Sequence, residues 1–541
     1  MSQTNLEQTH SGAPTNITNP NDNILLDKEI DKDVTIDPPK EVNTRSGKEY
    51  IAMSIFCFLV AFGGFVFGFD TGTISGFVAM DDFKERFGQL NGSGEYYLSN
   101  SRTGLMVSIF NVGCCIGGIF IGRIGDMWGR RIGIMVAMAI YVVGIAIQIS
   151  SDDKWYQFFI GRMVTGLAVG TVSVVAPVFI SEVAPKQVRG TLVCCYQLCI
   201  TLGIFIGYCC TYGTKTYDDA KCWRIPLGLC FVWAALLVAG MVNMPESPRF
   251  LMSKQRVDDA RRSIARSNKV DINDDVVEAE IRTIQAGLDK EALAGNADWM
   301  ELINGKPKIL RRVLVGVMTA ILQQLSGINY FFYYGTTIFK AVGMDDSFKT
   351  SIILGAVNFV STFANIWAIE SLGRRKTLLI GSVCMTICLI IYSALGSAHL
   401  YIDGFDNTPE NTRKPTGNAM IFITCLNIFF FASTWAGGVY CILSETYPLR
   451  IRSKAMSVAT GANWMFGFLI AFFTPFITSA IHFNYGFVFA GSMLFSVFFI
   501  YFFLCETKGL SLEEVDEMYA SGLKAWKTSD FVPQAEKNEE V

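Results

Sequence analysis

Residues 181–190 read SEVAPKQVRG, and the same pattern returns at residues 444–453 as SETYPLRIRS. A second motif is also repeated, because DMWGRR at residues 126–131 returns as ESLGRR at residues 370–375. In both cases the first copy lies in the first half of the chain and the second copy at the matching place in the second half. Two motifs repeated in the same order indicate a duplicated unit whose copies are parallel repeats.

The stretches around these motifs are strongly apolar. Of the 541 residues, 51% are hydrophobic and only 17% are charged, and the mean hydropathy is +0.35. A membrane-spanning helix needs about 20 mostly apolar residues. Runs of this kind predict twelve spans, at residues 51–76, 103–122, 132–150, 156–180, 191–213, 224–244, 312–340, 350–370, 376–397, 417–443, 454–477 and 483–504. The predicted fold class is therefore an all-α membrane protein, with twelve transmembrane helices in two six-helix bundles.

Polar stretches divide the chain into five predicted parts. These are a disordered N-tail at 1–48, a six-helix bundle at 49–244, a helical linker at 245–311, a second six-helix bundle at 312–506 and a C-tail at 507–541. The linker carries charges at helical spacing, so we expect short amphipathic helices that form a small intracellular domain. The connections after even-numbered spans are basic, which predicts that they and both termini are cytoplasmic. Asn91-Gly-Ser93 is then an extracellular glycosylation acceptor.

Several classes of function are disfavoured by composition. The net charge of −3 gives no sign of a nucleic-acid partner. Most of the 15 Cys lie in apolar runs, as small buried hydrophobes do, and the 3 His match no metal-binding spacing. We therefore expect no cofactor, no metal and no catalytic residues, so the chain is not predicted to be an enzyme. Membrane lipid surrounds the spans, and ubiquitin machinery is expected to act at the cytoplasmic tails, for instance at Lys28, Lys32 and Lys40.

Charged residues gather at the predicted cytoplasmic ends of the spans. Glycine permits a tight turn there, and arginine can bind a carboxylate through two parallel hydrogen bonds. One interpretation is that the arginines only set topology; the other is a gate, which is favoured because both halves carry the carboxylates as well. The predicted gate residues are Asp126, Arg130, Arg131, Glu182, Arg189, Glu246, Glu370, Arg374, Arg375, Glu445, Arg452 and Glu506.

Amide side chains lie inside four of the predicted spans. An amide offers a donor and an acceptor together, which suits ring hydroxyls. Hydrogen bonding between helices is the alternative, at ~0.6 kcal/mol each, but the number of amides favours a binding site. Gly327 allows local unwinding beside them. The candidate binding residues, with three aromatic residues for apolar ring faces, are Gln197, Gln323, Gln324, Asn329, Tyr333, Tyr334, Asn358, Trp435 and Asn463.

Asp70 is the lone acid of the first predicted span. A charge in mid-membrane costs ~2.5–3.5 kcal/mol or more, so Asp70 should be paired or protonated. Arg162, near the start of the fourth span, is the candidate partner. The pair is either a proton-coupling site or a permanent structural ion pair, and both interpretations remain open.

At this point the motifs resemble a known family. GRIGDMWGRR at 122–131, PESPR at 245–249, QQLSGIN at 323–329 and ETKG at 506–509 together resemble the sugar porter family of the major facilitator superfamily. FDTGTISG at 69–76 and YFFYYGTTIF at 330–339 resemble the yeast hexose transporters in particular. The resemblance covers about residues 51 to 530. One departure is Gly437-Gly438, because the family usually has proline in this part of the tenth span.

The resemblance implies the major facilitator fold, a central sugar site and alternating access in a yeast plasma membrane. It places the amides listed above at the sugar site and the charged residues at the inward gate. The function it implies is facilitated diffusion of hexose, that is glucose with fructose or mannose. The alternatives are a proton–sugar symporter that uses Asp70, and a sugar sensor, which the short C-tail disfavours.

Overall fold

The computed structural model describes residues 47–531, except residues 93, 185–188, 296–297, 307, 342–345, 401–409, 449 and 511. Lys28, Lys32, Lys40 and all but the last two residues of the predicted N-tail lie outside this range. The described chain is nearly all helical. The exception is a small hairpin of two strands, β1 (Gln89–Leu90) and β2 (Tyr96–Tyr97), and Asn91 is exposed at its turn.

The first half of the chain forms long apolar helices where six spans were predicted. Its helices are α2 (Gly47–Ala79), α3 (Asp81–Phe87), α4 (Asn100–Ile116), a π-helical turn (Gly117–Ile121), α5 (Arg123–Trp128), α6 (Arg130–Ile149), α7 (Trp155–Val183), α8 (Arg189–Thr214) and α9 (Lys221–Asn243). Short helices follow in the predicted linker: α10 (Pro248–Ser253), α11 (Val257–Asn268), α12 (Asp275–Ala294) and α13 (Glu301–Asn304). Apolar residues of α10, α11 and α12 pack together in a small core of their own, as the amphipathic spacing predicts.

The second half repeats the long helices, with two of them broken. Its elements are α14 (Ile309–Gln324), α15 (Ile328–Ala341), α16 (Ser347–Leu372), α17 (Arg374–His399), α18 (Glu410–Phe430), a π-helix (Phe431–Trp435), α19 (Ala436–Thr446), α20 (Arg452–Ile481), a 3₁₀ turn (His482–Asn484), α21 (Tyr485–Phe503), α22 (Leu512–Ser521) and a second 3₁₀ turn (Ala525–Asp530). Eleven segments of the described chain are long and apolar enough to cross a membrane. The last of them, Arg452–Phe503, contains both α20 and α21, which were predicted as separate spans.

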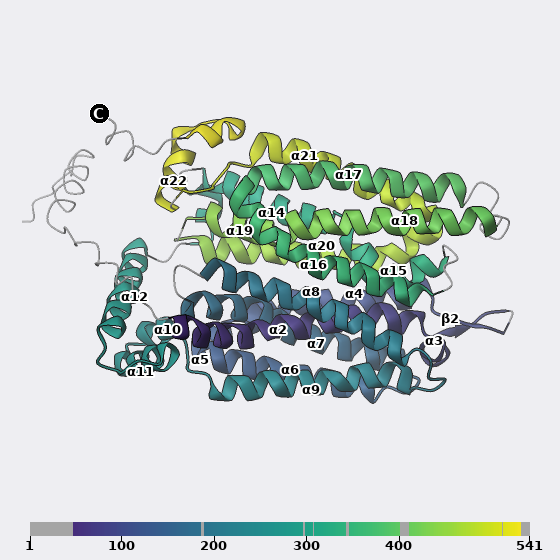
Figure 1. Ribbon diagram of the computed structural model, residues 1–541, viewed down its shortest axis with the longest axis horizontal. Coiled ribbons are helices and arrows are strands. Elements are labelled where there is room, and N and C mark those ends of the chain that lie inside the picture. The colour runs from purple at the N-terminus through teal and green to yellow at the C-terminus, as the bar shows by residue number, and fades with distance from the viewer. Residues whose placement is uncertain are drawn as a thin grey trace, which may run out of the picture. The chain divides into compact units, whose positions relative to one another are not determined.

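The helices of the two halves lie side by side in Figure 1. Helices α10, α11 and α12 lie at one end of the long helices, and β2 lies at the opposite end. The halves touch mainly along three helix pairs, α4 with α20, α8 with α16 and α2 with α15. A site between the halves therefore lies next to these helices.

Helices α2 and α8 approach closely because glycines line their contact. A Cβ added at Gly68 of α2 would lie only 1.9 Å from the carbonyl oxygen of Ile200 in α8. On the opposite face of the same contact, a Cβ added at Gly203 of α8 would lie 2.3 Å from the carbonyl oxygen of Phe65 in α2. Small residues on both faces let two backbones meet inside lipid, where van der Waals packing drives helix association.

We expect Gly68→Ala to destabilise the protein, because its methyl group must push α2 and α8 apart. Overpacking of this kind costs roughly 1–3 kcal/mol. Thermal unfolding of the detergent-solubilised protein would measure the loss. Gly228→Ala in α9 is the matched control, since its Cβ meets nothing within 4 Å. Equal melting temperatures for the two variants would contradict close packing at Gly68.

Candidate functional site

The seventh predicted span is interrupted between α14 and α15. Helix α14 ends at Gln324 and α15 begins at Ile328. Between them Gly327 has φ +78°, a left-handed conformation that glycine adopts without strain. The Ser326 hydroxyl donates to the carbonyl oxygen of Gln323 at 2.6 Å and so satisfies part of the broken helix. The predicted unwinding at Gly327 is confirmed.

Four of the predicted amides meet around this break. Asn463 of α20 donates from Nδ2 to Gln323 Oε1 at 2.9 Å and to the carbonyl oxygen of Ala320 at 2.9 Å. Gln324 Nε2 donates to Asn463 Oδ1 at 2.8 Å. Asn329 Nδ2 donates to Gln324 Oε1 at 2.5 Å. We call Gln323, Gln324, Asn329 and Asn463 the amide cluster. Its members fix one another, which orients their remaining donors and acceptors before any ligand arrives.

Two of the predicted aromatic residues lie on elements that contact the amide cluster or carry part of it. Gln323 Nε2 donates to the carbonyl oxygens of Trp435 at 3.0 Å and Ala436 at 3.3 Å, where the π-helix ends. Trp435 is fully buried, and its indole Nε1 makes no hydrogen bond within the described chain. Tyr334 of α15 donates from its hydroxyl to the carbonyl oxygen of Ala471 at 2.6 Å. A π-helical turn is a frequent feature of functional sites, and this one ends just before Gly437-Gly438, where the family pattern has proline.

Two predicted binding residues stand apart from the amide cluster. Gln197 is half-buried on α8, and Asn358 is 3% exposed on α16. No hydrogen bond joins either side chain to the cluster in the described part of the chain. Both helices nevertheless lie at the contact between the halves, since α8 packs on α16.

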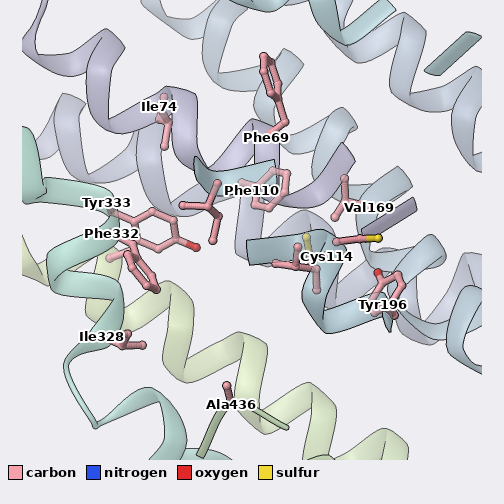
Figure 2. Packing of buried hydrophobic residues seen from close by; sticks show 14 of the residues in the cluster. Phe69, Ile74, Phe110, Cys114, Val169, Tyr196, Ile328, Phe332, Tyr333 and Ala436 are labelled. Atoms are coloured by element: carbon pink, nitrogen blue, oxygen red, sulfur yellow. The ribbon is translucent and has the colours of Figure 1, made fainter. Parts of the chain in front are cut away.

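Sequence reasoning missed Asn111, which lies on α4 in the first half. It is 1% exposed, and its Oδ1 accepts a hydrogen bond from the Tyr333 hydroxyl at 3.4 Å. Figure 2 shows that hydroxyl pointing away from α15, toward the region of Phe110. The signal was available, because Asn111 is an amide inside the predicted span 103–122, as the other candidates are amides inside spans.

Asp70 and Arg162 form a buried ion pair within the first half. Arg162 Nη1 of α7 lies 2.5 Å from Asp70 Oδ2 of α2, and the side chains are 2% and 1% exposed. The Arg162 guanidinium also lies over the Phe110 ring, 4.6 Å from its centroid. Asp70 Oδ1 and Arg162 Nε and Nη2 have no hydrogen-bond partner within the described residues. The two charges neutralise each other, which is what lets them lie in an apolar span.

The predicted gate residues of the first half form one charged cluster beside α10. Arg130 binds Glu182 through two hydrogen bonds of 3.0 Å, from Nε and Nη2. Glu246 accepts from the backbone N–H groups of Arg130 and Arg131 at 2.8 and 3.2 Å, and so caps the start of α6. The Ser247 hydroxyl donates to Glu182 at 2.6 Å. A carboxylate at a helix start meets unpaired N–H groups and the positive end of the helix dipole.

The second half repeats this cluster with matching residues. Arg374 binds Glu445 from Nε and Nη2 at 2.9 and 2.6 Å. Glu506 accepts from the backbone N–H groups of Arg374 and Arg375 at 2.9 and 3.2 Å, and so caps α17. The Thr507 hydroxyl donates to Glu445 at 2.6 Å, as Ser247 does to Glu182. Each carboxylate cap closes over a glycine of positive φ, Gly129 or Gly373.

The remaining predicted gate residues do not make matching interactions in the two halves. Asp126 pairs with Arg130 at 2.9 Å, although Asp126 is 73% exposed. Glu370, its counterpart in the repeat, is exposed and has no ion pair within the described residues. Arg452 donates to the carbonyl oxygen of Tyr447 at 3.3 Å, and the side chain of Arg189 lies outside the described residues. Every pair named in these clusters lies within one half or between a half and the short segment that follows it.

An ion pair between the two halves lies at the opposite end. Lys215 Nζ, just after α8, binds Asp346 Oδ1, just before α16, at 2.6 Å. Lys349 lies 3.5 Å from the same carboxylate. Burial favours a raised pKa for Asp346, but the hydrogen bond and charge of Lys215 outweigh it, so the pKa is lowered below its usual value.

Two further hydrogen bonds cross between the halves near this end. The hydroxyls of Ser75 and Thr336 lie 2.8 Å apart, and Asn100 Nδ2 donates to Ser479 Oγ at 2.9 Å. Since Ser75 and Thr336 belong to α2 and α15, these contacts hold the halves together at the end that carries β2.

Comparison with known proteins places these features in one family. The model of the family "Sugar (and other) transporter" matches residues 56–519. The chain is 55% identical to a low-affinity glucose transporter of Kluyveromyces lactis, over 96% of this chain and 92% of the relative. It is also 53% identical to the high-affinity hexose transporter HXT6 of Saccharomyces cerevisiae, over 93% of this chain and 87% of the relative.

Solved structures agree on the fold. The inward-open xylose transporter XylE of E. coli matches with a TM-score of 0.69 at 24% identity, over 86% of this chain and 99% of that one. The proton:xylose symporter XylE bound to 6-bromo-6-deoxy-D-glucose matches with a TM-score of 0.69 at 26% identity, over 87% of this chain and 99% of that one. The predicted major facilitator fold is confirmed.

We expect Glu506→Gln to lower thermal stability, because the neutral amide caps α17 more weakly than the carboxylate. Hydrogen bonds to a charged group are worth ~1.5–3 kcal/mol each. Thermal unfolding in detergent would report the loss. Glu370→Gln is the control, since this acid of the same half is exposed and unpaired in the described chain. A melting temperature that falls as much in Glu370→Gln would contradict the capping role.

Proposed function

The chain belongs to the sugar transporter family, and from this premise we propose that it carries hexose across the plasma membrane by facilitated diffusion. The proposed substrate is glucose, with fructose or mannose. The function is transport and not catalysis. Relatives named as glucose and hexose transporters, more than half identical over most of their length, support the substrate class.

The amide cluster carries this proposal. Gln323, Gln324, Asn329 and Asn463 gather amide donors and acceptors at an interrupted helix, and Gln323 also bonds the main-chain carbonyl of the buried Trp435. A hexose needs both chemistries, because its hydroxyls bind amides and its ring carbons contact aromatic faces. A neutral hydrogen bond contributes ~0.5–1.5 kcal/mol. Millimolar affinity corresponds to about −4 kcal/mol, so a few such bonds bind the sugar and still release it.

The proposed mechanism is alternating access. The cross-half bonds at Lys215–Asp346 and Ser75–Thr336 favour a state closed at the end that carries β2, which we assign to the outside. The charged clusters at the other end keep each half rigid, so the halves rock as units about the sugar. We further propose that both termini are cytoplasmic, that Asn91 is glycosylated, and that ubiquitin machinery acts at the tails.

Proton symport is the second candidate, because Asp70 is buried beside the region of the site. The close Arg162 partner favours the structural role instead. A carboxylate that must gain and lose a proton in each cycle would need this ion pair to open, whereas a facilitator can keep it closed.

Uptake of radiolabelled glucose in yeast lacking its own hexose carriers tests the proposal. We expect uptake that persists with a protonophore and only equilibrates the sugar. Accumulation above the outside level that collapses with the protonophore would assign proton coupling to Asp70. No uptake of any hexose, with the protein at the cell surface, would favour a sugar sensor.

We also expect Asp346→Asn to favour the outward-open state by removing the Lys215 ion pair. Partly exposed pairs contribute ~0.2–1 kcal/mol, so the outward-open population should rise about 1.4- to 5-fold. The apparent KM for outside sugar should fall by up to the same factor, because the apparent affinity is proportional to the fraction of protein that is open to the outside. Initial rates of entry into sugar-free cells would measure it.

The dependence on external pH follows from the lowered pKa of Asp346. A depressed pKa means that the pair is intact above the usual carboxyl range and is lost as pH falls through the lowered value. Wild-type KM should therefore approach that of Asp346→Asn only at low external pH, while the variant stays constant. The exchanged pair Lys215→Asp with Asp346→Lys should move the KM back toward the wild-type value, although Lys349 then repels the new lysine. If Asp346→Asn had the wild-type KM, the Lys215–Asp346 pair would not stabilise the state closed to the outside.

A further inference from the structure

Asn111 has a polar atom that nothing in the described protein satisfies. Its side chain is 1% exposed, and Nδ2 makes no hydrogen bond. The other end of the amide contacts the Tyr333 hydroxyl at 3.4 Å. Because a hydroxyl can donate or accept, turning the amide over would pair Nδ2 and leave Oδ1 free instead. In either orientation Tyr333 holds one end of Asn111, and the other end is left for a ligand. A buried polar group without a partner is rare enough to require an explanation.

The free end of Asn111 and the Gln324 amide of the cluster both lie close to Gly467. A Cβ added at Gly467 of α20 would lie 3.7 Å from Asn111 Nδ2 and 3.3 Å from Gln324 Oε1. The first is an ordinary van der Waals distance and the second is tighter than most, so a group placed where a side chain at Gly467 would lie touches both amides. Gln324 is already bonded to Asn463 and Asn329, so a group seated above Gly467 would touch Asn111 and the cluster together.

Aromatic rings of both halves pack together at residues adjacent in sequence to Asn111 and Asn463. Phe67 of α2 stacks on Phe110 of α4 with ring centroids 6.1 Å apart. Phe67 also meets the edge of Trp464 of α20 at 5.8 Å. Phe110 and Trp464 are the sequence neighbours of Asn111 and Asn463. Apolar rings beside convergent amides are the usual composition of a site for a small polar ring compound.

We propose that Asn111 is a sugar-contacting residue, which binds one hexose hydroxyl from the first half while the amide cluster binds others from the second half. This assignment rests on the proposed function and adds to it a specificity-determining residue on α4. The sugar then bridges α4 and α20, two helices that pack on each other across the halves. A sugar that contacts both halves binds most tightly to the conformation in which the halves close around it. Alternating access requires such a difference in affinity between conformations.

Monodeoxyglucoses, each lacking one hydroxyl, test the assignment as inhibitors of glucose uptake. In the wild type, the analogue lacking the hydroxyl that Asn111 binds should be weaker than glucose by about 2- to 12-fold, the value of one hydrogen bond. In Asn111→Leu that ratio should fall to about one at this position, while the ratios at the other positions stay unchanged. A residue that only supports the fold would leave every ratio as in the wild type.

Gln148→Leu is the matched control, because Gln148 is a fully buried amide of the first half that bonds Thr165. It should change no ratio, whatever its effect on the amount of protein. Asn111→Ser replaces the leucine variant if that one does not reach the membrane. The assignment of Asn111 is overturned if the inhibition ratios of its variants all match wild type, or if they all change together. Either result leaves the proposed function standing. Absence of hexose uptake by the wild type would overturn the proposed function, and this assignment with it.

Discussion

Backbone hydrogen bonding inside an apolar membrane is the constraint on which the rest of the structure depends. Lipid offers no partner to an unpaired N–H or C=O group, so a spanning helix can be interrupted only where protein groups replace the lost bonds. The break at Gly327 meets this condition, because the Ser326 hydroxyl bonds the carbonyl of Gln323 and the Gly327 N–H bonds the carbonyl of Gln324. The amides that a sugar requires gather around the same break, where Asn463 bonds Gln323 and Gln324.

The duplicated motifs form ion pairs and helix caps within each half, and none of these joins one half to the other. Arg130 with Glu182, and Arg374 with Glu445, join elements of one bundle, and the caps Glu246 and Glu506 fasten the segment that follows each bundle. Gene duplication explains why the two clusters match even to the hydroxyls of Ser247 and Thr507. The ion pair between the halves, in contrast, joins unlike residues, Lys215 and Asp346.

The predictable part of the structure was the part with local or repeated signals. Apolar runs located the long helices, and the paired arginines and acids located both charged clusters. Contacts across the halves could not be read from the sequence, because residues such as Lys215 and Asp346 are far apart in the chain and lie in ordinary loops. Asn111 was missed for a different reason, since one asparagine in an apolar helix carries little weight until its neighbours are known. Glu370 shows that a repeated residue need not keep a repeated contact.

The buried pair of Asp70 and Arg162 has an electrical consequence. Moving one elementary charge across a membrane involves work of about 2.3 kcal/mol per 100 mV. Because opposite charges lie 2.5 Å apart on helices of one half, they shift together and their contributions to that work cancel. A rocking half that keeps this pair closed, with an uncharged sugar bound, moves no net charge at this site. The voltage across the membrane then does no net work on this pair, and the site leaves the direction of flux to the sugar gradient.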